Sequence, residues 1–123
     1  MAIIPARDVE TSARFYAEML GFDANSFFRD DDGTAFFAIV GLGTVTIGLQ
    51  KLDEFVVHEG TVAYIYVDDA KTLARRFTDA GGTLRHPPHK TFYGILEFDL
   101  KDPDGHVIAF GQDLEPGPGG PGL

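Results

Sequence analysis

The most constraining feature of this sequence is a weak internal repeat, in which the second half follows the first at a shift of 61 residues. At this shift an aspartate, two apolar residues and a glycine of the first half align with similar residues of the second. The aligned pairs are Asp8 and Asp69, Ala13 and Ala74, Tyr16 and Phe77, and Gly21 and Gly82. Aspartate is favoured just before a helix, and glycine just after one. Identity is thin, but the shared order of elements predicts that one structural unit is used twice.

The first half predicts a strand, a helix and three more strands. Apolar residues recur at helical spacing in VETSARFYAEML, between Asp8 and Gly21. Short apolar runs before and after this helix are separated by Asp- and Gly-containing turn signals. The expected strands cover residues 1–5, 22–29, 34–40 and 44–49, with turns at 30–33 and 41–43.

The second half predicts the same order after a polar, irregular linker at residues 51–60. Asp69 caps the expected helix, AKTLARRFTDA, and Gly81-Gly82 ends it. The expected strands cover residues 62–67, 83–86, 95–100 and 107–112. Pro87-Pro88 is expected to break the second of these strands, and Asp102-Pro103-Asp104-Gly105 is a strong turn signal before the last one.

These elements predict an α+β fold built from two βαβββ modules. Since one helix cannot cover both faces of its sheet, the two modules should form curved mixed sheets with helices outside and a concave inner face. A single ferredoxin-like α+β domain is the alternative, and it explains less of the chain. The expected organisation is one domain over residues 1–113, with modules at about 1–50 and 61–113. A disordered Gly/Pro tail is expected at 114–123.

Charge and composition exclude several classes of protein. A net charge of −9 argues against nucleic-acid binding and against docking on anionic membranes. It modestly favours a cationic small ligand, although acidity that simply aids solubility is the alternative. The absence of cysteine excludes disulfides and thiolate chemistry. No apolar run approaches the roughly 20 residues of a membrane span, and no signal peptide is recognisable, so a cytoplasmic location is expected.

Three segments in the right order resemble the vicinal-oxygen-chelate superfamily, the glyoxalase/bleomycin-resistance protein/dioxygenase family. They are ARDVETSARFYAEMLGF, VAYIYVDDAKTLARRFTDAGG and YGILEFDLKDPDGHVIAFG, and the last resembles the bleomycin-resistance-like branch in particular. The resemblance implies paired βαβββ modules, a homodimer and ligand clefts inside the curved sheets. Metal-using members hold a divalent ion there, whereas bleomycin-binding members sequester the drug without a protein-held ion.

The positions that would hold the family's metal carry unsuitable side chains in this sequence. By the resemblance they fall on Met1, Gly48, Val62 and Ala109, none of which offers imidazole or carboxylate. Gln50 lies on the same strand face as Gly48, but one ligand does not make a site. We therefore expect no metal site and no cofactor. A surface, loop or turn role is expected for each of the histidines: His58, His86, His89 and His106.

Strand alternation selects the candidate ligand-binding residues. In residues 62–67, Tyr64 and Tyr66 share one face and are expected to line the cleft, unless they merely fill the sheet. In residues 95–100, Phe98 and Leu100 belong to the helix side, so Glu97 and Asp99 point to the cleft or the dimer seam. These carboxylates could meet a cationic ligand, act as a general base, or form ion pairs.

Three more candidates complete the predicted site. Phe92 and Tyr93 precede Gly94 on a loop that could close over the cleft, and Gln50 shares its face with Thr46 and Gly48. For residues 34–40, alternation does not decide which set of side chains faces inward.

Three functions are open at this point. The leading one is a metal-independent protein that sequesters an aromatic, cationic antibiotic or metabolite, such as a bleomycin-type glycopeptide, in a dimer cleft. The second is a metal-dependent lyase or dioxygenase, which stoichiometric bound metal would identify. The third is a metal-free enzyme of secondary metabolism with Glu97 as acid or base, which turnover of its substrate would identify.

Overall fold

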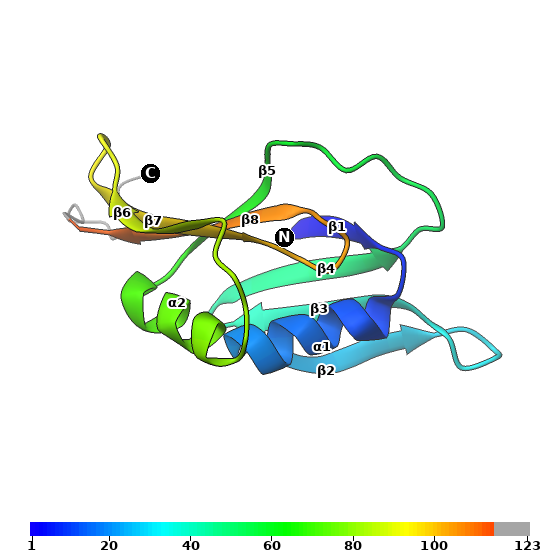
Figure 1. Cartoon of the computed structure of the whole chain (residues 1–123). Helices are drawn as coiled ribbons and strands as arrows, with labels where there is room; N and C mark the ends of the chain where they lie inside the picture. The colour runs from blue at the N-terminus through cyan, green and yellow to red at the C-terminus, as the bar shows by residue number, and fades with distance from the viewer. Residues whose placement is uncertain (115–123) are drawn as a thin grey trace.

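The computed structural model describes residues 1–114 and contains two helices and eight strands (Figure 1). The first module holds β1 (Ala2–Ala6), α1 (Val9–Leu20), β2 (Asp23–Arg29), β3 (Ala35–Leu42) and β4 (Val45–Lys51). The second holds β5 (Thr61–Tyr66), α2 (Ala70–Asp79), β6 (His86–Lys90), β7 (Ile95–Lys101) and β8 (Val107–Asp113). The predicted order of elements is confirmed in both halves.

The two sheets have the same topology. Their strand orders are β1-β4-β3-β2 and β5-β8-β7-β6, so the first strand of each module pairs with the last. That pairing is parallel, and the remaining pairs are antiparallel. A parallel pair needs a crossover connection, which each helix supplies. The two mixed sheets and their helices confirm the α+β fold of paired βαβββ modules.

The two aspartates identified in the repeat cap their helices in the same way. The Asp8 carboxylate accepts from the Thr11 amide at 3.0 Å, and Asp69 accepts from Thr72 at 3.0 Å. These backbone hydrogen bonds lower the pKa of both carboxyl groups. At the other end, Gly21 takes the left-handed conformation with φ of 78°. In α2 that conformation falls on Gly81, so the repeat slips by one residue after the helix.

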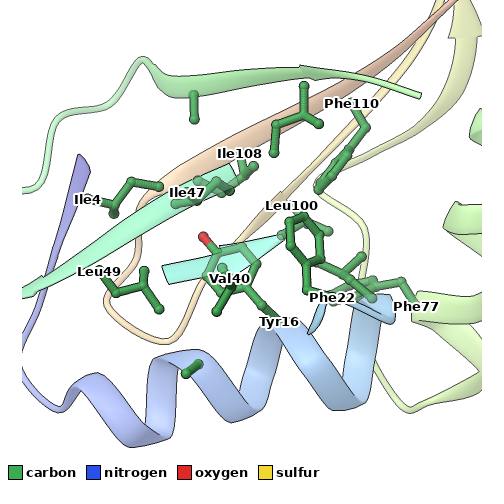
Figure 2. Packing of buried hydrophobic residues seen from close by; sticks show 14 of the residues in the cluster. Ile4, Tyr16, Phe22, Val40, Ile47, Leu49, Phe77, Leu100, Ile108 and Phe110 are labelled. Carbon is green, nitrogen blue, oxygen red and sulfur yellow. The ribbon is translucent and has the colours of Figure 1, made fainter. Parts of the chain in front are cut away.

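One hydrophobic core joins the two modules (Figure 2). α1 packs on β2, β3 and β4, α2 packs on β6, β7 and β8, and the two helices contact each other. The Phe15 and Phe77 rings meet edge to face at 5.9 Å across that contact. Tyr16 and Phe77, the aromatic pair of the repeat, are both almost fully buried. Each sheet therefore buries one face under the helices. We call the opposite face the open face.

Register settles which side chains of β3 face the helices. Ala38 and Val40 are fully buried and pair with Leu49 and Ile47 of β4. Phe37 and Ile39 lie on the open face, where they pair with Gln50 and Gly48.

The strand expected at residues 83–86 is wrong, because β6 runs through the two prolines. In β6, His86 pairs with Asp99 and His89 pairs with Glu97, with an irregularity in register between them. β6 is the edge of its sheet, where a missing amide N–H leaves no interior hydrogen bond unmade. Pro87 and Pro88 are therefore accommodated at a bulge and do not end the strand.

His106 is buried at the junction of the modules, which the expected turn role did not anticipate. Its Nε2 lies 2.9 Å from the Pro5 carbonyl oxygen, and its amide donates to Asp102 at 2.9 Å. Phe55 of the linker stacks on the His106 ring at 5.3 Å, and the Arg7 guanidinium lies 4.4 Å from the Phe55 ring centre. Through these contacts the linker packs against both the end of β1 in the first module and the β7–β8 turn of the second.

Within residues 1–114, neither helix is long and apolar enough to cross a membrane. The tail expected to be disordered falls, beyond Leu114, outside the described residues.

Gly82 makes the helix–core contact sensitive to a single methyl group. A Cβ at this position would lie 2.3 Å from the Phe77 ring, whose burial leaves it little room to move. We predict that Gly82→Ala lowers the free energy of unfolding by about 1–3 kcal/mol, measured by denaturant titration. Gly60→Ala is the control, since a Cβ there meets nothing within 4 Å. Equal stability of the two variants would contradict the packing described.

Candidate functional site

The open face of the second sheet carries tyrosines. Along β5, Ala63 and Ile65 are buried on the helix side, with 8% and 3% exposed. Tyr64 is 38% exposed on the other side, and its ring lies 5.3 Å from that of Tyr66. The alternation predicted from the sequence is confirmed, and it brings both tyrosines to the face away from the helices.

Two tyrosines from different elements converge on one carboxylate oxygen of β7. The Tyr64 hydroxyl donates to Glu97 Oε1 at 2.7 Å, and the Tyr93 hydroxyl donates to the same oxygen at 2.6 Å. Hydrogen bonds to a charged acceptor are among the stronger ones in proteins. Both donors use the same oxygen, Oε1, and neither uses Oε2. We call Tyr64, Tyr66, Tyr93 and Glu97 the tyrosine–glutamate cluster.

The cluster keeps its phenols protonated. Burial raises the pKa of Tyr64 well above its ordinary value, and the hydrogen bond to Glu97 and its negative charge add to the shift. For Tyr93 the hydrogen bond to Glu97 is the main cause of a raised pKa, with burial second. Burial and the nearby carboxylates of Asp113 and Glu97 raise that of Tyr66. The face therefore presents phenol rings and a carboxylate acceptor, while the hydroxyl hydrogens of Tyr64 and Tyr93 are donated to Glu97.

The Tyr64 side chain occupies space that a side chain at Gly111 of β8 would fill. Gly111 was not among the site residues predicted from the sequence. It pairs with Tyr66 on one side and Glu97 on the other. A Cβ at Gly111 would lie 2.3 Å from the Tyr64 hydroxyl oxygen and 2.8 Å from Ile95 Cγ2. A glycine inside a strand often marks such a close approach, which is the signal that could have identified it.

Asp99 lies on the same face but is already paired. Its Oδ2 accepts from Arg85 at 2.8 Å, its Oδ1 lies 2.8 Å from His86 Nδ1, and only 8% of the residue is exposed. Of the alternatives left open by the sequence, the ion pair is the one this geometry shows. Arg85 and His86 were not among the predicted site residues.

Phe92 and Tyr93 lie at the tip of the β6–β7 hairpin. Phe92 is 99% exposed, Tyr93 is 53% exposed, and their rings meet edge to face at 4.9 Å. Gly94 turns the chain with φ of 81° and donates its amide to the Thr91 carbonyl. The tip therefore extends an aromatic surface from the cluster into solvent.

Gln50 is not brought to the cluster. It lies in the other sheet, where it pairs with Pro5 of β1 and Phe37 of β3. Its open face carries exposed apolar side chains, with Ile3 at 55% and Phe28 at 48% exposure, beside the exposed polar side chains of Thr46 and Gln50. The predicted ligand-binding set is thus divided between the open faces of two sheets.

Two hollows adjoin the tyrosine strand at the module junction. Tyr66 lines one of about 490 Å³, between the end of α1, the β3–β4 turn and the start of α2. Tyr64 lines another of about 320 Å³, together with Met1, Ala2 and residues 44–47. Both are open grooves whose walls come from the two modules.

The residues at the family's metal positions do not fit a metal ion. Gly48, Val62 and Ala109 have no side-chain donor atoms, and Met1 offers only a thioether. Among residues 1–114, no group of three or more histidine, aspartate or glutamate side chains is arranged to hold an ion. Chemistry that depends on the family's four-ligand site therefore has no support in this chain.

Comparison with a family model identifies the family to which this chain belongs. The model described as the Glyoxalase/Bleomycin resistance protein/Dioxygenase superfamily matches residues 1–110. The chain belongs to this superfamily. No curated protein matches the sequence.

Solved structures share the fold of this superfamily member. TioX from Micromonospora sp. ML1 superposes with a TM-score of 0.75 at 19% identity, covering 91% of this chain and 95% of TioX. A glyoxalase-related enzyme from Clostridium phytofermentans gives 0.77 at 17% identity, covering 90% and 91%. TnmS3, an antibiotic binding protein from Streptomyces sp. CB03234, gives 0.68 at 21% identity, covering 92% and 94%. At these identities the likeness shows the fold alone.

Tyrosine ionisation tests the cluster. A tyrosine whose pKa is raised on folding stabilises the folded protein below about pH 10. This contribution is lost as the pH rises through the pKa of that tyrosine in the folded state. Glu97→Gln removes the negative charge, so the pKa of Tyr64 and Tyr93 should fall, and phenolate absorbance should appear at lower pH. Glu54→Gln, an exposed linker residue, is the control. Superimposable titrations of Glu97→Gln and the unmodified chain would count against the cluster.

Proposed function

We propose that this protein is a metal-independent binding protein of the bleomycin-resistance type, which sequesters an aromatic, cationic antibiotic or metabolite in a cleft of a homodimer. The observation that carries the proposal is the tyrosine–glutamate cluster. Two tyrosine hydroxyls 2.7 and 2.6 Å from one Glu97 oxygen hold the carboxylate in place on an open sheet face.

The cluster suits a ligand that combines a planar ring with a positive charge. The phenol rings of Tyr64 and Tyr66 supply aromatic surface, which favours stacking on planar heterocycles. Glu97 Oε1 is engaged by the two tyrosines, so Oε2 is the oxygen available to a cationic N–H donor. The net charge of −9 adds a long-range attraction for cations.

Exposed apolar side chains support the homodimer part of the proposal. Ile3 and Phe28 stand 55% and 48% exposed on the open face of the first sheet, and Phe92 and Tyr93 stand 99% and 53% exposed beside the second. Phe28 contacts Phe37, and Phe92 contacts Tyr93. Exposed apolar side chains that lie together in this way commonly mark an interaction surface. In the proposed dimer, the face of one copy that carries Ile3 and Phe28 covers the tyrosine-bearing face of the other and closes the ligand cleft.

The fold relatives are consistent with binding as the activity. TnmS3 is an antibiotic binding protein of the same fold, and its structure covers nearly the whole of this chain. This chain shares the architecture of such a protein, and we propose the tyrosine–glutamate cluster as its recognition surface.

Isothermal titration calorimetry with metal-free bleomycin tests the proposal. We expect about one drug molecule per chain, and a loss of affinity of about tenfold or more in Glu97→Gln, because a hydrogen bond to a charged group is removed. Gly111→Ala should weaken binding as well, since its Cβ displaces the Tyr64 hydroxyl. Glu54→Gln should bind like the unmodified chain.

Two results would contradict different parts of the proposal. If bleomycin gives no heat at high protein concentration, bleomycin is not the ligand. If it binds and Glu97→Gln binds equally well, the cluster is not the recognition site.

A further inference from the structure

The bulge in β6 places two imidazoles on the same face of the second sheet. In a regular strand, residues three apart point to opposite faces. Here His86 pairs with Asp99 and His89 pairs with Glu97, so a spacing of three on β6 matches a spacing of two on β7. Asp99 and Glu97 share a face, and the two histidine rings accordingly lie 6.4 Å apart, at 69° to one another.

Hydrogen bonds fix the same tautomer in both rings. His86 Nδ1 lies 2.8 Å from Asp99 Oδ1, and His89 Nδ1 lies 2.8 Å from the Pro87 carbonyl oxygen. A carboxylate and a carbonyl can only accept, so Nδ1 carries the proton in each ring. In the neutral imidazoles, the lone pair is then on Nε2, which is the atom free to bind an ion.

The carboxylate behind His86 is well placed to support metal binding. Asp99 is 8% exposed and accepts from Arg85 as well as from His86. A carboxylate on the far nitrogen of a histidine fixes the ring and raises its basicity, and this arrangement is common behind metal-binding histidines. Arg85 Nη1 is also 3.2 Å from His86 Nδ1, but both atoms carry protons, and the Asp99 charge offsets that of Arg85. Glu97, opposite His89, adds a negative charge.

We infer that His86 and His89 bind a divalent transition-metal ion through their Nε2 atoms, on the edge strand beside the tyrosine–glutamate cluster. Imidazole favours zinc, copper and nickel, at roughly 2.0–2.1 Å for zinc. The ring centres lie 6.4 Å apart, so a shared ion requires these two exposed side chains to move closer together. Only two protein ligands are supplied, so water or a small molecule occupies the remaining positions.

This site is separate from the metal positions of the superfamily. Those positions fall on Met1, Gly48, Val62 and Ala109, on β1, β4, β5 and β8 or beside them, whereas both histidines belong to β6. It does not rest on the proposed function, because it requires neither an aromatic ligand nor a second copy of the chain.

Zinc titration of the chain without an affinity tag tests the inference. We expect one Zn²⁺ per chain by isothermal titration calorimetry, and a loss of affinity of about tenfold or more in both His86→Asn and His89→Asn. His58→Asn is the matched control, since His58 is an exposed linker residue and its variant should bind Zn²⁺ like the unmodified chain. Asp99→Asn should bind Zn²⁺ more weakly through the loss of support for His86.

Cu²⁺ provides a second readout with the same variants. Electron paramagnetic resonance should show two imidazole nitrogens bound to Cu²⁺ in the unmodified chain and one in each single variant. Zinc affinity that is unchanged in both His86→Asn and His89→Asn would overturn the inference, as would the absence of zinc binding by the unmodified chain. Since both histidines are exposed, each variant is expected to keep its fold, and a thermal melt of each variant checks this. Bleomycin titration remains a separate result.

Discussion

The packing of α1 against α2, with a sheet behind each helix, is the interaction on which the rest of this structure depends. Phe15 and Phe77 meet at that contact, and Tyr16 is buried beside them in a core that draws on both modules. The helices cover one face of each sheet, and within residues 1–114 the opposite faces carry partly exposed side chains such as Ile3, Phe28 and Tyr64. The side chains on these open faces are therefore the ones accessible to other molecules.

The two open faces differ in chemistry. The first sheet presents Ile3, Phe28 and Phe37, which suit contact with another protein surface. The second presents Tyr64, Tyr66 and Glu97, which combine aromatic surface with a carboxylate held by hydrogen bonds. This difference between the two faces is consistent with the proposal that one copy of the chain covers a face of another and holds a ligand between them.

Much of the fold could be predicted from the sequence because its signals are local. The aspartate caps depend on a few neighbouring residues, and strand alternation places Tyr64 and Ile65 on opposite faces regardless of what surrounds the strand. Alternation did not decide which side chains of β3 face the helices. Both of its faces are apolar, and only pairing with Gly48 and Leu49 distinguishes them.

The rest of the candidate site depends on contacts between distant residues. The convergence of Tyr64 and Tyr93 on Glu97 joins three elements, and the fit of Tyr64 over Gly111 joins two strands. Two prolines usually end a strand, so the sequence assigned His86 and His89 to a loop. At a sheet edge the cost of proline is small, and the bulge that results brings the two histidines together.

Sedimentation equilibrium of the unmodified chain over a range of concentrations tests our proposal that a second copy of the chain covers the open faces. The account predicts a mass of about twice the 13.4 kDa of one chain. Phe28→Glu is expected to shift the protein towards the mass of one chain, whereas Val56→Glu, at a more exposed linker position, is not. A mass of one chain at every concentration, with or without ligand, would contradict the claim.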